Sequence, residues 1–95
     1  MSLCVVKHQH SAETCPAGDP QMGPMLAQHV SPPNAQQFGM GLHGEAVADG
    51  AHTQYLIVDG EREQVDQFMA PFSQVGSVEV IPSSRCEQVV ARARC

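Results

Sequence analysis

An apolar run, Tyr55-Leu56-Ile57-Val58, follows an Asp49-Gly50 turn signal and constrains the fold more than any other feature of the chain. Asp-Gly favours a tight hairpin because such turns need positive φ, and the run after it is apolar on both faces. We therefore expect two antiparallel strands, residues 42–48 and 53–58. The second of them is expected to lie inside a sheet rather than at its edge.

The segment before this hairpin predicts a helical region interrupted by proline. Prolines crowd residues 16–24, and proline fits the first turn of a helix but not its middle, so a short helix is expected from Pro24. Ser31 as a cap, followed by Pro32, predicts a second helix start that ends at Gly39. The first helical region is therefore expected to be broken in two.

A longer helix is expected over residues 61–72, where apolar side chains recur at helical spacing. These side chains are Val65, Phe68, Met69 and Phe72. Strands are expected on both sides of the helical segments. Residues 2–9 contain a β-branched run, and residues 77–81 alternate before Pro82 closes the segment.

Ser84, with Glu87 three positions later, matches a capping box for a short C-terminal helix. The order β-α-β-β-α-β is that of a ferredoxin-like α+β fold, an antiparallel sheet with both helices on one face. We expect residues 1–95 to form one such domain. With only four aromatic residues the core must be aliphatic, and the uncovered sheet face would expose valine and leucine to water. This favours a homodimer formed through the sheet.

The element order and chain size resemble small single-domain members of the dimeric α+β barrel group. The residues that carry the resemblance are the amphipathic helix 64–72 and the segment Val-Gly-Ser-Val-Glu-Val at 75–80. Some small proteins of this group resemble metal-binding domains, and others are cofactor-free oxygenases or isomerases that work in the barrel cavity. The proline-interrupted first helix and the Cys15-Pro16 loop depart from the group, so no site residue is transferred.

Composition excludes several classes of function. Ten acidic against five basic residues give a formal charge of −5, which disfavours nucleic-acid binding. No apolar run is long enough to span a membrane, and the start lacks a secretory signal layout, so we expect a soluble, cytoplasmic protein. The four cysteines are irregularly spaced, with no Cys-x-x-Cys pair, and reduced thiols are expected.

Candidate metal ligands are concentrated in residues 4–16. Alternate side chains of a strand share a face, so His8 and His10 point the same way, with backbones roughly 7 Å apart. Glu13 and Cys15 follow in a loop that can fold back over them. Imidazole with carboxylate or thiolate suits zinc, nickel or copper. The predicted ligands are His8 and His10, with one or both of Glu13 and Cys15.

Other candidates are placed elsewhere by the expected topology. His43 and Glu45 are second choices, because their strand runs parallel to the first and begins at the far end of the sheet. His29 is expected on the outer face of its helix, and His52 at a solvent-exposed turn. Cys4 is expected to pack in the core as a small hydrophobe.

Two further sulfur-containing groups leave alternatives open. Cys15 precedes a proline in a loop near imidazoles, so it is a ligand, a reactive thiolate, or only a half-buried side chain. Met22, Met25 and Met40 could bind cuprous ion, but methionine is more often core filler, and this core lacks aromatics.

The sequence therefore predicts a small transition-metal-binding protein that sequesters, delivers or senses its ion. The first alternative is a cofactor-free enzyme of the barrel type, with His8 or His10 as a general base and Cys15 as nucleophile, or Tyr55 orienting the substrate. No motif defines a reaction class for it. The second alternative is an accessory subunit of a larger complex.

Overall fold

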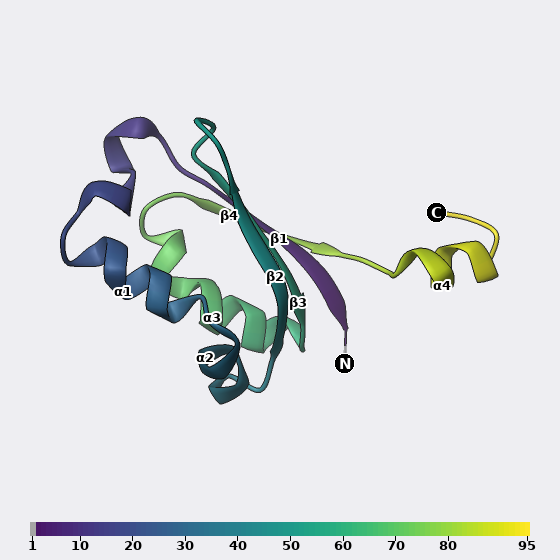
Figure 1. The fold of residues 1–95 in the computed structure, drawn as a ribbon. Coiled ribbons are helices and arrows are strands. Elements are labelled where there is room, and N and C mark those ends of the chain that lie inside the picture. Colours follow the sequence, from purple (N-terminus) through teal and green to yellow (C-terminus); the bar gives the residue numbers. More distant parts are fainter. Residues whose placement is uncertain (1) are drawn as a thin grey trace.

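The computed structural model describes residues 2–95 and contains a four-stranded sheet with helices against one face (Figure 1). The strands are β1 (Leu3–Gln9), β2 (Gly41–Ala48), β3 (Thr53–Asp59) and β4 (Ser77–Pro82). The α-helices are α1 (Met22–His29), α2 (Pro32–Gln37), α3 (Arg62–Ser73) and α4 (Cys86–Ala91). Two short 3-10 turns, η1 (Ala12–Thr14) and η2 (Pro16–Gly18), precede α1.

The sheet has the order β2-β3-β1-β4, and each neighbouring pair is antiparallel. β3 pairs with both β2 and β1, which confirms the predicted position of residues 53–58 inside the sheet. Gln9, the last residue of β1, lies opposite Thr53 of β3 and Ser77 of β4. The end of β1 therefore meets the β2–β3 turn, and we call this part of the molecule the hairpin end.

The core lies between the inner face of the sheet and the helices. Alternate residues of β1 point inward, and Cys4, Val6 and His8 are all buried, with only 1% of His8 exposed. The predicted core role of Cys4 is confirmed, and Met40 is also buried, whereas Met25 is 59% exposed. Helix α3 contributes the four apolar positions predicted for it: Val65, Phe68, Met69 and Phe72.

The first helical region is broken in two, as predicted. Ser31 caps α2, because its Oγ accepts a hydrogen bond from the Asn34 backbone N–H at 3.4 Å. Helix α1 begins before Pro24, since Asp19 Oδ1 accepts a hydrogen bond from the Met22 N–H at 2.8 Å. These contacts fix where the two short helices begin over the inner face of the sheet.

The capping box predicted for the C-terminal helix is wrong by one position. The cap of α4 is Arg85, whose N–H donates to Gln88 Oε1 at 3.0 Å. The predicted cap, Ser84, instead accepts a hydrogen bond from the Arg92 guanidinium at 3.1 Å. The helix itself is present, but Ser84 stabilises its far end rather than its start.

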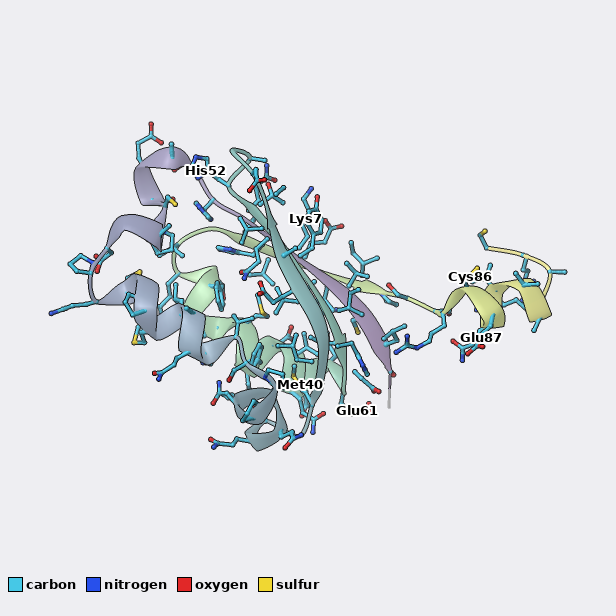
Figure 2. The ribbon with its side chains drawn as sticks, viewed as in Figure 1. Lys7, Met40, His52, Glu61, Cys86 and Glu87 are labelled. Atoms are coloured by element: carbon cyan, nitrogen blue, oxygen red, sulfur yellow. The ribbon has the colours of Figure 1, made fainter. Side chains whose placement is uncertain are left out.

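The outer face of the sheet carries exposed apolar side chains, among them Tyr55, Ile57 and Ile81, and Lys7 also points to this side (Figure 2). Residues 83–95, including α4, extend away from the sheet (Figure 1), and the molecule measures 46 × 29 × 18 Å. Among residues 2–95, every helix is too short or too polar to cross a membrane.

Candidate metal centre

A cavity of about 500 Å³ lies at the hairpin end, between α1 and the inner face of the sheet. Its wall is mostly apolar and includes Leu26, Ala27, Val30, Val47 and Phe72. The wall also holds the imidazoles of His8, His10 and His52, the thiol of Cys15, and the carboxylates of the exposed residues Glu45 and Asp49. Ligand sites are usually apolar cavities in which a small number of polar groups converge. This cavity is therefore the candidate site.

Backbone pairing brings His10 and His52 together. The His10 N–H donates to the His52 carbonyl oxygen at 3.1 Å, which extends the pairing of β1 and β3 by one residue. His52 has a φ of 51°, a left-handed conformation that histidine adopts more readily than most side chains. The two rings lie edge to face, with centroids 5.2 Å apart. The hairpin turn therefore delivers an imidazole to the end of β1.

The loop after β1 folds back over the same end of the sheet. Thr14 Oγ1 donates to the Val75 carbonyl oxygen at 3.1 Å, which ties the loop to the chain just before β4. A Cβ at Gly23 would lie 3.1 Å from the Pro16 carbonyl oxygen, so glycine lets α1 pack closely on η2. Cys15, between η1 and η2, is held beside the two histidines as a result.

The nearest ligand atoms of His10, Cys15 and His52 all lie within 4.8 Å of one another. Ligands of a tetrahedral zinc ion, bound at about 2.0–2.3 Å, are roughly 3.5 Å apart. Small rotations of these half-buried side chains are sufficient to reach that spacing. The cluster could hold a metal ion.

Three imidazole nitrogens of the cavity lack hydrogen-bond partners within residues 2–95. Both ring nitrogens of His10, and Nε2 of His8, are buried and contact no donor or acceptor of the described chain. Leaving a buried polar atom unpaired costs about 1–3 kcal/mol, so such atoms are normally paired. An ion or ligand in the cavity would supply the missing partner.

His8, in β1, and His10, just after it, both favour the neutral form. Burial, and next the neighbouring His10 ring, lowers the pKa of His8 below 6.5, against a smaller opposite effect of the Phe72 backbone. Burial, and next the His52 ring, lowers the pKa of His10 below 6.5. A neutral imidazole keeps a lone pair available for a metal ion, so the environment supports ligation at neutral pH.

His29 was predicted on the outer face of its helix, and this prediction is wrong. Its ring stacks on Phe68 with centroids 4.6 Å apart, and Nε2 lies 2.6 Å from the Phe68 carbonyl oxygen. A carbonyl only accepts, so Nε2 carries the proton, and Nδ1 accepts from the Asn34 side-chain amide at 3.1 Å. Both nitrogens are used, and His29 joins α1 to α3.

Of the four predicted ligands, His10 and Cys15 belong to the cluster. His8 lines the same cavity, with its ring centroid 5.2 Å from that of His10, so the predicted common side of these two imidazoles is confirmed. Glu13 is exposed on η1 and is not in the cavity wall. The structure therefore brings three of the four predicted side chains together.

The two second-choice ligands have separate positions. His43 lies at the opposite end of the sheet, where its Nε2 is 3.6 Å from Asp59 Oδ2, in line with the expected strand direction. Glu45 lies nearer and contributes to the cavity wall, although it is not one of the three clustered donors.

Sequence reasoning missed His52, which was predicted to be solvent-exposed. It is only half-buried, but it faces His10 across the β1–β3 pairing. The signal was available: if residues 53–58 pair antiparallel to the first strand, the residue just before them lies beside the residue just after that strand. That rule places His52 next to His10.

Comparisons with protein-family models, curated proteins and solved structures gave no match to this chain. The assignment of a function therefore depends on the geometry of the cavity.

Proposed function

We propose that the protein binds a transition-metal ion through His10, Cys15 and His52, in order to sequester, deliver or sense it. The observation that carries the proposal is the cluster of three donor atoms within 4.8 Å of one another. The buried His10 nitrogens without partners among the described residues support it independently. His8, which also lines the cavity, lies beside His10 and is the nearest additional ligand of the set predicted from sequence.

The donor set favours zinc or copper as the ion, with nickel as the third choice. Two imidazoles and one thiolate form a borderline-soft set, which suits zinc and copper, whereas calcium and magnesium require more oxygen ligands. The cluster contains no carboxylate, because Glu13 is exposed on η1.

The proposal is tested with protein purified without an affinity tag. We expect the chain to retain close to one equivalent of zinc or copper, measured by mass spectrometry of the metal, and to take up cobalt(II) as a spectroscopic probe. Loss of two ligands in a His10→Ala, His52→Ala variant should weaken zinc binding on the order of 100-fold or more. Cys15→Ser should remove the sulfur-to-cobalt charge-transfer band.

The matched control is His43→Ala, which removes an exposed histidine at the opposite end of the sheet. Its zinc affinity should equal that of the unchanged protein. A chain that binds no transition metal, or a double variant that binds zinc as tightly as the control, would refute the proposal.

A cofactor-free enzyme is the second candidate, and the apolar cavity around His8 and His10 favours it. In that case Cys15 acts as a nucleophile next to an imidazole base. Alkylation of the metal-free protein by iodoacetamide should then be at least about tenfold faster at Cys15 than at the exposed Cys86, and the excess should vanish in His10→Ala. Equal rates argue against this candidate.

We also propose that the fold is ferredoxin-like. Read from the other edge, the order is β4-β1-β3-β2, so β3 separates the two strands joined by α1 and α2, and β1 separates the two joined by α3. Two interleaved β-α-β units of this kind support the proposal.

The outer sheet face supports a homodimer. Tyr55 and Ile57 are 42% and 43% exposed there, and a second copy would cover them. Sedimentation analysis tests this proposal. If the protein is a monomer, the face would be free to bind another protein, which would favour the accessory-subunit alternative.

A further inference from the structure

The three clustered donors leave one position of a tetrahedral ion unfilled by the cluster. His10, Cys15 and His52 all line the 500 Å³ cavity, so a bound ion would face this space. Metal sites that are purely structural are closed by four protein ligands, whereas three ligands with an open position bind a small molecule. The cavity is also within the size range of small-ligand sites.

The net charge of the proposed metal site indicates which class of small molecule it would bind. A divalent ion with one thiolate and two neutral imidazoles carries a net charge of +1, and an unbalanced charge is costly beside apolar walls. A monoanion at the open position would neutralise the site. The two carboxylates of the wall, Glu45 and Asp49, belong to exposed residues, where water screens their charge. The rest of the wall beyond the donors is mostly apolar, with Leu26, Val30 and Phe72 in it, and it suits an aliphatic or aromatic body.

We infer that the cavity binds a small organic carboxylate whose head completes the coordination of the ion and whose apolar body lies between α1 and β2. This inference rests on the proposed metal site. The carboxylate replaces the water that otherwise fills the fourth position, and no covalent bond within it is broken. The competing occupants of that position are the imidazole of His8 and the carboxylate of Glu45, which are also in the cavity wall.

The test uses the full chain loaded with cobalt(II), with acetate and hexanoate as probes. Binding of either should change the visible spectrum of the ion. Each buried methylene is worth roughly fourfold in affinity, so hexanoate should bind at least about 20-fold more tightly than acetate even if only part of its chain is buried.

A paired substitution on α1 tests where the apolar body lies. Ala27 is in the cavity wall, and Gln28, the next residue, is not. Ala27→Trp should fill the cavity and reduce the preference for hexanoate to about threefold or less, with cobalt affinity unchanged. Gln28→Trp should keep the full preference.

The possible failures are distinguishable. A chain that takes up no cobalt refutes the proposed metal site. A cobalt-loaded protein that binds acetate and hexanoate equally refutes this inference alone. Hexanoate binding that appears only in Glu45→Gln, or only in His8→Ala, also refutes it, because the residue removed would then be the native fourth ligand.

Discussion

His29 and His10 lie under the same sheet and show two ways in which a protein can bury an imidazole. Both nitrogens of His29 have partners, the Phe68 carbonyl oxygen and the Asn34 amide. Both nitrogens of His10 are buried without a partner in residues 2–95. The first arrangement contributes to stability within the chain, and the second leaves two polar atoms that an ion or ligand in the cavity could pair. Satisfaction of polar atoms therefore separates the structural histidine from the candidate ligand.

The largest effect on stability is expected at Gly76, which packs against the end of β1 beside His8. A Cβ at Gly76 would collide with the Gln9 carbonyl oxygen and lie 2.9 Å from His8 Nε2. Gly76→Ala should therefore lower the free energy of unfolding by about 2–4 kcal/mol, because β1 and the start of β4 must separate. Denaturant unfolding measures this. Gly44→Ala, where nothing lies within 4 Å of the new Cβ, is the control and should cost below about 1 kcal/mol.

The direct comparison is between His29→Ala and His10→Ala in metal-free protein. His29→Ala removes two hydrogen bonds and a stacked ring, and it should lower the free energy of unfolding by about 2–3 kcal/mol. His10→Ala removes two unpaired buried nitrogens and should change it by less than about 1 kcal/mol. Thermal or urea unfolding decides the matter. Equal losses in the two variants would contradict the distinction drawn between them.

Acid should destabilise the folded metal-free protein through His8 and His10. The pKa values of His8 and His10 are below 6.5 in the folded chain, so the unfolded chain takes up protons first as the pH falls. The free energy of unfolding should therefore be greatest above about pH 6.5, and should decline below it until the folded histidines also protonate. Urea unfolding between pH 7.5 and about 5.5 measures the slope.

A His8→Gln, His10→Gln variant is the control for that slope and should show a flatter profile over the same range. An unchanged slope would assign the pH dependence to other groups.

The smallest effect is expected at Glu13. It was predicted as a ligand from sequence, but its side chain is exposed on η1. Glu13→Gln should therefore change zinc affinity by less than about threefold, in line with a solvent-exposed charge. Competition with a chromophoric chelator is precise enough to detect this. A loss comparable to that of Cys15→Ser would restore Glu13 to the ligand set.

Local patterns were sufficient to predict most of the architecture. Prolines and the Ser31 cap predicted a broken first helical region, and Asp49-Gly50 predicted the hairpin. Alternation along β1 predicted that His8 and His10 share a side, and the loop after them does return to the strand end. These features depend on neighbours in sequence, where steric and hydrogen-bonding rules are strong.

The missed features depend on contacts between distant segments. His52 reaches His10 only through the pairing of β1 with β3. His29 turns inward because its ring donates to the Phe68 carbonyl oxygen and accepts from the Asn34 amide. Glu13 and Cys15 are two residues apart on the same loop, yet η1 leaves one outside and directs the other inward. The position of His52 could have been derived by pairing the predicted strands, but the orientations of His29, Glu13 and Cys15 follow from three-dimensional packing, which local sequence patterns do not specify.

The two ends of the described chain lie away from the hairpin end, since β1 begins and β4 finishes at the opposite end of the sheet (Figure 1). Residues 83–95 then lead further outward as an arm. A fluorophore or a solid support attached at the arm would leave the mouth of the cavity open to solution. If the cavity binds an ion or a small molecule, immobilisation through the arm would leave it accessible.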